Sequence, residues 1–518
     1  MKYLKIILIL FIILTAVVLV RNAWVCDDAY ISFRVIDNFI HGYGLRWNIA
    51  ERVQVYTHPL WLFFLSLFYF FTKEIFITSI VISIILVLIS IYLVTYKISN
   101  DTSLSLLAVT ILCFSKAFID FSTSGLENPA TFLLLSIFFA VFIHERSDPK
   151  KLLILSFIAS LGVLNRMDSL LLFFPALSYD FYKCLKFKFK LLNSFRSVII
   201  GFMPFILWEI FSIIYYGFPF PNTAYAKLNT GVPSGVLIEK GLLYLGSSFY
   251  GRQDIVTPVV IVLGIFAAFF IKDKKVKYIA CGIILYLLYV VKIGGDFMIG
   301  RFLSASLFCS VIIISRLDIY KRKTVIILAM VFVLAMGLIS PKNPLVSGSQ
   351  YKTEYIKDMQ VVDERGYYYQ GSSFLKALKG ENMPSFFTVE QGKLIKLKQA
   401  DYISSKIIGF LGYYAGPIVY IVDPYALSDP LLARLPIPTY DKVKPGHYER
   451  LFPEGYLRTI SEGQNYIVDQ DLAKYYDELL LITRGSLFDG KRFISILKIN
   501  TGQFDHLINE YKSNFDFY

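Results

Sequence analysis

The chain contains 518 residues, of which 56% are hydrophobic and 17% aromatic, and it carries a formal net charge of +13 at pH 7. These proportions exclude an ordinary soluble domain and are typical of a protein with many membrane-spanning helices. The positive charge does not indicate a nucleic-acid partner, because the lysines and arginines gather in short loops between apolar runs, where they orient the spans.

Eleven apolar runs are predicted to cross the membrane as helices, although several are shorter than the roughly 20 residues that a perpendicular span needs. They lie at about 3–20, 76–96, 103–116, 128–143, 151–164, 168–182, 197–216, 255–271, 276–292, 301–315 and 323–340. The first run is too long for the core of a signal peptide, and further apolar segments follow it, so we expect an uncleaved anchor.

One more run, "PLWLFFLSLFYFF" at 59–71, is ambiguous. At 1.5 Å per residue it reaches only about 20 Å, against a hydrocarbon core of about 30 Å. If it does not span, the lysine-rich loops and the amino terminus all lie on one side, as the positive-inside tendency requires. We therefore predict a helix lying in the interface, within a first outer loop at 21–75, and an outer carboxyl terminus.

With this topology the unusual charged motifs all fall on the outer side. The first is "CDDAY", where Asp27 and Asp28 follow the first span. One of them could cap the following helix, because a carboxylate there accepts free backbone amides. Two adjacent carboxylates repel each other and exceed what a cap needs, so we expect at least one to act as a general base. Alternatively, the pair could hold a divalent cation.

The next two outer turns combine acids and bases. "STSGLENP" has Ser124 and Glu127 in the spacing of a capping box, which is the interpretation we favour for Glu127. Asp120, just upstream, is not explained by a cap and is a candidate site residue. "NRMD" places Arg166 and Asp168 in a short turn, where they could pair with each other or where the arginine could bind a substrate anion.

Two glycine- and proline-marked loops follow. "YYGFPFPNTAYAK" is predicted to be a shaped loop, with Asn222 and the cation Lys227 as candidates. "GGDFMIGRF" surrounds Asp296 and Arg301 with glycines that let a ligand approach the backbone; here too a salt bridge competes with phosphate binding. Arg34 and His58 in the first outer loop complete the candidates in this half of the chain. Taken together, these groups suit an amphiphilic substrate with a phosphate head.

From residue 341 the pattern becomes polar and is punctuated by glycine and proline. We therefore predict a membrane domain at 1–340 and an extracytoplasmic α+β domain at 341–518. "IVYIVD" and "RFISILKI" are predicted as strands, and "LAKYYDELLLI" and "FDHLINEYKSNF" as helices. The candidate acceptor-binding residues of this domain are Asp429, Arg434, His447 and Arg450. The tail could equally be a carbohydrate-binding module with no part in the chemistry.

Several motifs together resemble the mycobacterial terminal β-(1→2)-arabinofuranosyltransferase family, of the GT-C class of membrane glycosyltransferases. They are "DDAYISFR", "HGYGLRWN", "ERVQVYTHPLW", "TSGLEN", "YYGFPFPNTAYAK", "GGDFMIGRF", "DPLLARLP" and "PGHYERLFPEGY". The resemblance runs from Asp27 to about Tyr456. It implies a sugar donor linked to polyprenyl phosphate, an attacking acceptor hydroxyl, and an active site in the first outer loop with its base at Asp27 or Asp28.

We therefore expect a bacterial plasma-membrane glycosyltransferase that moves a sugar, arabinofuranose by the resemblance, onto an envelope glycan or glycolipid. Arg166, Arg301, Lys227 and His58 would stabilise the departing phosphate. The alternative is a transporter or flippase of lipid-linked sugars. Transporters tend to have internal repeats and charges near the bilayer midplane, and neither is evident in this sequence. A scaffold without activity fits poorly with so many costly charges at the membrane edge.

Overall fold

The structure is a computed structural model that describes residues 2–513 except 145–146, 188–189, 229, 250–253, 319–321, 346–354, 357–360 and 439–443. The chain forms two compact units that are interleaved in sequence. Unit 1 comprises Met1–Cys26, Glu74–Phe205 and Ser234–Pro384, and unit 2 comprises Asp27–Lys73, Ile206–Pro233 and Ser385–Tyr518. This division differs from the predicted boundary at residue 340, because the first outer loop groups with the tail.

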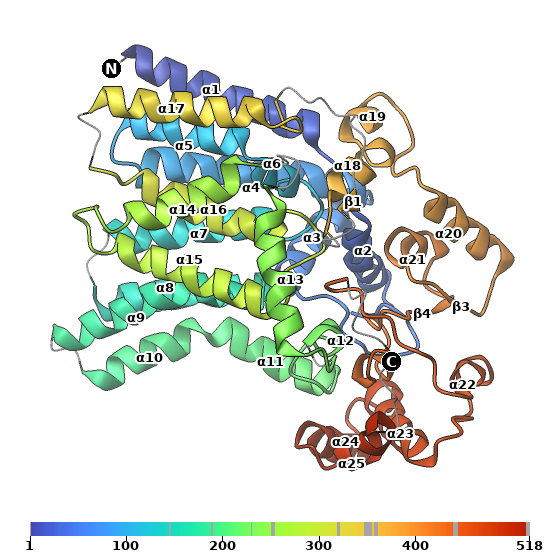
Figure 1. Cartoon of the computed structure of the whole chain (residues 1–518). Coiled ribbons are helices and arrows are strands. Elements are labelled where there is room, and N and C mark those ends of the chain that lie inside the picture. Colours follow the sequence, from blue (N-terminus) through green and yellow to red (C-terminus); the bar gives the residue numbers. More distant parts are fainter. Residues whose placement is uncertain are drawn as a thin grey trace. The chain divides into compact units, whose positions relative to one another are not determined.

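Unit 1 consists mainly of apolar helices that lie side by side, and one helix, Ser234–Ser247, runs across the others (Figure 1). They are α1 (Lys2–Asn22), α4 (Ile75–Leu93), α5 (Thr102–Phe114), α6 (Lys116–Phe121), α7 (Asn128–His144), α8 (Pro149–Asn165), α9 (Leu170–Lys186), α10 (Leu191–Gly201), α13 (Ser234–Ser247), α14 (Val256–Ala267), α15 (Val276–Lys292), α16 (Arg301–Ile314) and α17 (Lys323–Ile339). After α17 come the short pair β1 (Tyr355–Ile356) and β2 (Val361–Val362) and the helices α18 (Glu364–Tyr368) and α19 (Phe374–Leu378).

Each of the eleven predicted runs coincides with a helix, but length and composition alone qualify few of them as spans. Among the described residues, Lys2–Asn22 and Ile75–Ile98 pass, and the bent pair Leu191–Gly201 and Met203–Tyr215 gives a third candidate. Six shorter apolar helices, including Pro59–Thr72, have 10–17 residues. These helices support a membrane location, while the number of spans and the sidedness of the loops stay predictions.

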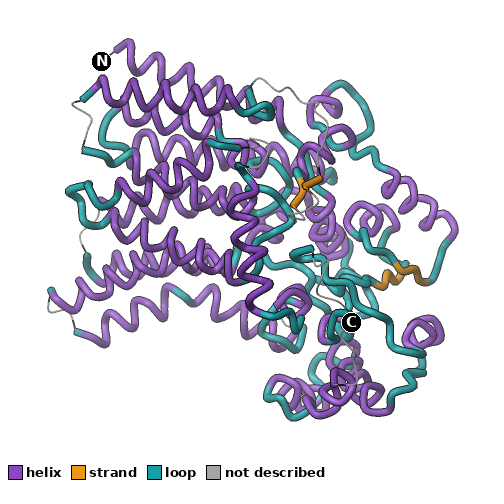
Figure 2. Tube along the Cα trace, in the orientation of Figure 1, coloured by secondary structure: helices purple, strands orange, loops and turns teal. Residues whose placement is uncertain are grey.

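Unit 2 combines helices from three parts of the chain. They are α2 (Asp27–Ile40), α3 (Pro59–Thr72), α11 (Met203–Tyr215), α12 (Asn222–Leu228), α20 (Phe387–Lys398), α21 (Gly409–Ala415), α22 (Tyr456–Glu462), α23 (Gln470–Arg484), α24 (Gly490–Asn500) and α25 (Asp505–Ser513). Strands β3 (Tyr402–Ser404) and β4 (Tyr420–Val422) pair in parallel. Figure 2 shows how little strand the described chain contains.

The secondary structure predicted for the tail is confirmed for three segments and wrong for one. "IVYIVD" contains β4, and the two predicted helices are α23 and α25. "RFISILKI" is not a strand but lies in α24. The Asp489 side chain caps that helix, and Arg492, Ser495 and Ile496 are buried at the three- and four-residue spacing of a helix face. The apolar residues of this run therefore follow the 3.6-residue period of a helix and not the two-residue period of the predicted strand.

Candidate functional site

The acid pair opens α2 in unit 2, and its two members have different surroundings. Asp27 accepts hydrogen bonds from the backbone amides of Gly409 (3.0 Å) and Phe410 (2.8 Å), one on each carboxylate oxygen. These amides begin α21, so Asp27 caps a helix 382 residues away in sequence rather than its own. Asp28 is half-buried, whereas Asp27 is 7% exposed. The predicted cap was one of the helix that follows the pair, so this contact with α21 is a different one, and the cap on α2 stays a prediction.

Burial raises the pKa of Asp27 from 3.8 to about 7, against the lowering effect of the amide hydrogen bond from Phe410, and the charge of Asp28 raises it further. Because both oxygens of Asp27 face amide hydrogens, a cation bound there would meet positive dipoles. These amides make Asp27 the less suitable ligand of the two, and the predicted divalent cation at the pair stays a prediction. Within the described ranges, no cluster of three or more His, Cys, Asp or Glu side chains has the spacing of a metal site.

Two glycines let α2 and α21 approach closely. A Cβ atom at Gly409 would lie 1.9 Å from the carbonyl oxygen of Asp27, and one at Gly412 would lie 2.8 Å from Trp47. Arg34, another candidate, is buried beside them and donates to the carbonyls of Trp47 (2.9 Å), Gly412 (2.8 Å) and Val419 (3.0 Å). These bonds favour a structural role for Arg34, which holds α21 against the first outer loop.

His58 lies at the head of α3 in unit 2. Its Nε2 atom and the hydroxyl of Ser32 on α2 are 2.8 Å apart. His58 is only 6% exposed, and its hydrogen bond with Ser32 connects the start of α3 to α2. The helix that was predicted at 59–71 is present as α3; its place in the membrane interface stays a prediction.

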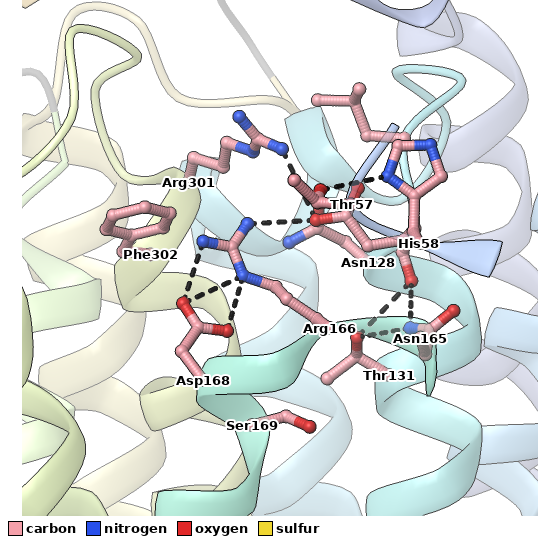
Figure 3. A network of polar contacts seen from close by, with 12 residues as sticks. Thr57, His58, Asn128, Thr131, Asn165, Arg166, Asp168, Ser169, Arg301 and Phe302 are labelled. Carbon is pink, nitrogen blue, oxygen red and sulfur yellow. Dashed lines mark hydrogen bonds and ion pairs between the residues drawn. The ribbon is translucent and has the colours of Figure 1, made fainter. Parts of the chain in front are cut away.

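The charged turns of unit 1 form one cluster of five side chains. Arg166 makes a bidentate ion pair with Asp168, at 2.7 Å and 2.8 Å, and donates to Glu127 at 2.9 Å (Figure 3). Arg301 is 3.3 Å from Glu127 and 3.6 Å from Asp296. Three carboxylates thus face two guanidinium groups, which leaves one negative charge in excess when all five are ionised. The ion pairs that the sequence offered as alternatives to anion binding are the observed contacts.

The capping box predicted at Ser124 and Glu127 is wrong. Helix α7 begins at Asn128, so Ser124 lies several residues before it. Gly125 has a φ of +83°, which breaks any helix at this point. The Glu127 side chain is fully buried and accepts from the two arginines instead.

A small pocket adjoins this cluster, and its lining mixes polar groups with aromatic rings. Its lining includes Asn128, Thr131, Arg166, Ser169, Tyr286, Arg301 and Phe302. The guanidinium carbon of Arg166 lies 4.3 Å from the centre of the Phe302 ring. Figure 3 shows the guanidinium group of Arg166 facing Asp168, with Arg301 and Phe302 beside it. Of this lining, the sequence identified only the two arginines, since an isolated tyrosine, phenylalanine or asparagine in an apolar helix gives no signal.

Asp120 belongs to a second buried network of unit 1. Lys116 contacts it within α6 and also reaches Asp363, at 3.0 Å. Arg365 is 3.7 Å from Asp120 and donates to the side chain of Asn22 at 2.6 Å. These contacts join the end of α1 to α6 and α18, so they favour a structural role for Asp120.

Most of the remaining candidates connect the proline-rich loop to the tail inside unit 2. Asn222 donates to the carbonyls of Ala426 (2.9 Å) and Asp429 (3.0 Å). Asp429 accepts from Tyr456 at 2.7 Å, and burial raises its pKa to about 7. Arg434 donates to Pro430 at 2.6 Å. These groups order the loop rather than project from it.

Arg450, Lys227 and His447 complete this region. Arg450 is buried and donates to the carbonyls of Leu435 (3.0 Å) and Ala226 (2.8 Å). Lys227 is half-buried on α12. His447 stacks edge-on against Tyr425 with ring centres 5.0 Å apart. Burial lowers the pKa of His447 well below its usual value, and the charges of Lys444 and Lys227 lower it further.

Comparison with known proteins agrees with the motif resemblance. Residues 58–208 match the family model described as dolichyl-phosphate-mannose-protein mannosyltransferase. The chain is 24% identical over 332 residues to a terminal beta-(1->2)-arabinofuranosyltransferase of Mycobacterium tuberculosis, with 56% of this chain and 52% of the relative covered. The enzyme of the same name from Corynebacterium glutamicum is 25% identical over 388 residues, with 67% and 55% covered. The chain thus spans about half the length of these relatives.

The crystal structure of the Archaeoglobus fulgidus oligosaccharyltransferase in complex with Zn and sulfate is similar to that of this chain. It superimposes with a TM-score of 0.45 and 11% sequence identity, and the match covers 80% of this chain and 62% of that one. The predicted resemblance to GT-C-class glycosyltransferases, and to terminal arabinofuranosyltransferases in particular, is confirmed by the sequence comparisons.

Proposed function

We propose that the protein is a membrane glycosyltransferase of the bacterial envelope that transfers one sugar from a polyprenyl-phosphate donor to a glycan or glycolipid. Arabinofuranose is the first sugar to test, because the relatives that match most of this chain bear that activity in their names. The proposal includes a multi-pass location in the plasma membrane and chemistry on its extracytoplasmic face. The observation that carries it is the asymmetric acid pair at the start of α2.

Asp28 is the general base in this proposal. Asp27 already accepts an amide hydrogen on each oxygen, while Asp28 is less buried and so more accessible to a substrate. Asp28 takes the proton of the acceptor hydroxyl as its oxygen attacks the anomeric carbon, and the bond from that carbon to the lipid phosphate breaks. Asp27 is a positioning residue that fixes the first turn of α2 against α21.

The cluster around Arg166 and Arg301 is assigned to sugar hydroxyls rather than to the donor phosphate. Its two guanidinium groups are already neutralised by Glu127, Asp168 and Asp296. An added phosphate would face an excess of negative charge, whereas a neutral sugar can bond to planar polar groups. The aromatic lining of the adjoining pocket offers a ring face for the same ligand.

The test is transfer of radiolabelled arabinofuranose from decaprenyl-phosphoryl arabinofuranose to a short glycan acceptor. Asp28→Asn should reduce kcat by about 100-fold or more, because general bases contribute roughly 10²–10⁴-fold. Asp37→Asn is the matched control: it removes a half-exposed carboxylate of the same helix that accepts from Tyr69 at 2.5 Å. This control should turn over like wild type.

The roles within the pair reverse if Asp28→Asn retains turnover while Asp27→Asn, still folded, loses it. Wild type that fails with arabinofuranose calls for a panel of other polyprenyl-phosphate sugars. If none of these is transferred and labelled lipid crosses a bilayer instead, the enzyme proposal is wrong and the protein is a transporter.

A further inference from the structure

Three arginines of unit 2 meet at the ends of two helices, although they come from distant parts of the chain. Arg52 and Arg492 both donate to the carbonyl of Ile482 near the end of α23, at 3.3 Å and 2.8 Å. Arg492 also donates to the carbonyl of Tyr215, the last residue of α11, at 2.9 Å, and Arg46 donates to the hydroxyl of that tyrosine at 3.3 Å. We call these residues the arginine triad.

Helix capping explains only part of this positive charge. A helix carboxyl end carries about half a negative charge, so two ends supply about one against three guanidinium groups. In the part of the chain that the structure describes, no member of the triad forms an ion pair. The neighbouring Glu51 is engaged by Arg484 at 3.4 Å. This is the reverse of the Arg166 cluster, where carboxylates outnumber arginines.

Arg52 shows most directly that a ligand group is missing. Arg52 is only 6% exposed, and its buried Nε atom has no hydrogen-bond acceptor among the described residues. Burial lowers the pKa of Arg52, and the charge of Arg46 lowers it further. The other end of the guanidinium group donates to the carbonyls of Ile482 and Gly485, so an anion would supply the acceptor that Nε lacks.

Arg52 lines a small pocket, and the rest of the lining is largely aromatic and apolar. The lining includes Gln54, Tyr216, Phe218, Phe220 and Tyr225. The helix that leads to the triad has an apolar exposed face, since Leu207, Ile210 and Ile213 of α11 are 57%, 50% and 40% exposed. A ligand here would place a charged group at the arginines and find apolar surface beside it.

We propose that Arg46 and Arg52 bind the phosphate group of an amphiphile. Arg492 is fully buried and is fixed behind them by the carbonyls of Ile214, Tyr215, Ile482 and Leu487. Guanidinium forks match the geometry of phosphate oxygens, and the apolar face of α11 suits a hydrocarbon chain. A lipid-linked sugar donor is such an amphiphile, so in this respect the inference rests on the proposed function. The phosphate site is then separate from the Arg166 cluster that the sequence favoured.

The experiment measures binding of farnesyl phosphate to the purified full-length protein in detergent micelles, with farnesol as the uncharged probe. Farnesyl phosphate should bind at least about tenfold more tightly than farnesol, since a charge-assisted contact is worth roughly 1.5–3 kcal/mol. Arg46→Gln and Arg52→Lys should remove most of that difference. Arg458→Gln is the control, because Arg458 is an exposed arginine of the same unit that pairs with Glu462 on its own helix and lies over the ring of Tyr466.

Competition identifies the source of the phosphate. Displacement by inorganic phosphate shows that the anion alone suffices, and displacement by phosphatidylglycerol micelles shows that bulk membrane lipid uses the site. The proposal is overturned if Arg46→Gln, with an unchanged Tm, binds both farnesyl probes as Arg458→Gln does. Arg46 is half-buried and has one backbone acceptor, so this variant keeps the test valid even if Arg52→Lys fails to fold.

Binding and turnover can fail separately. Wild type that transfers no sugar but shows triad-dependent binding would contradict the proposed function and support the phosphate site. If wild type transfers sugar while the triad variants bind farnesyl phosphate normally, the proposed function is supported and the phosphate site is contradicted.

Discussion

At the scale of single residues, neighbours that look equivalent in sequence acquire different tasks from their surroundings. Asp27 and Asp28 are adjacent carboxylates, but the first is fixed by the amides of a distant helix and the second is half-buried. Likewise Arg166 is neutralised by carboxylates, whereas Arg52 has none as a partner in the described part of the chain. Charge alone therefore did not indicate which arginines could bind a phosphate.

The raised pKa of Asp27 predicts a pH dependence of stability. Its folded value of about 7 exceeds 3.8, so between these values the folded protein holds a proton that the unfolded chain has released. The free energy of unfolding should therefore fall as pH rises from about 4 to 7, by at most about 1.4 kcal/mol per pH unit from this group. Asp27→Asn should flatten that slope in denaturant unfolding of the detergent-solubilised protein.

Tyr30→Phe is the control for this measurement. It alters the same interface, where the Tyr30 and Phe410 rings lie 4.6 Å apart, and leaves every carboxyl in place. Its slope should match that of wild type. An equal slope in Asp27→Asn would show that this carboxyl is not the titrating group.

The Arg166–Asp168 pair predicts strong coupling between two substitutions. Arg166→Gln removes the counter-charge of Asp168 and leaves Glu127 with Arg301 alone, so it should lower the free energy of unfolding by about 3–5 kcal/mol. The double variant Arg166→Gln/Asp168→Asn should lose less than the sum of the single variants, by roughly 0.5–3 kcal/mol. Additive losses in this double-mutant cycle would mean that the pair is not a coupled unit and would weaken the assignment of this cluster to neutral sugars.

At the scale of elements, α2 and α21 lie very close together, and glycine makes this possible. A Cβ atom at position 409 would overlap the Asp27 carbonyl at 1.9 Å, so Gly409→Ala must separate the helices. We expect a loss of about 1–3 kcal/mol in the free energy of unfolding, as overpacking costs, together with reduced turnover. Gly490→Ala is the control, because a Cβ atom there meets nothing within 4 Å. Equal stability of the two variants would contradict the close approach.

The sequence predicted elements far better than it predicted partners. The apolar runs all appear as helices because helical periodicity is a local property, and α24 was missed only because its run of Phe, Ile and Leu also suits a strand. The amides of Gly409 and Phe410, the carbonyl of Ile482 and the ring of Phe302 could not be predicted. They reach the candidate residues through tertiary packing between segments hundreds of residues apart, which no local pattern records.

At the scale of the whole molecule, the first outer loop and the tail belong to one compact unit. A tail that was only a separate binding module could be removed while transfer to small acceptors continued. A chain ending at Pro384 lacks the amides that hold Asp27 and the carbonyl that Arg52 contacts. We expect this truncation to reduce transfer to small acceptors at least as strongly as Asp28→Asn does. Retained activity on such acceptors would restore the module interpretation.

The same interleaving sets an order of events during synthesis. Residues 27–73 leave the ribosome early, but the partner of Asp27 is made 382 residues later. At about 5–20 residues per second, α2 waits roughly 20–80 s before α21 exists to receive it. During that interval the carboxylate of Asp27 and the guanidinium groups of Arg34 and Arg52 lack the tail residues that contact them in the finished protein. The acid pair therefore exists in the growing chain long before the helix that fixes it.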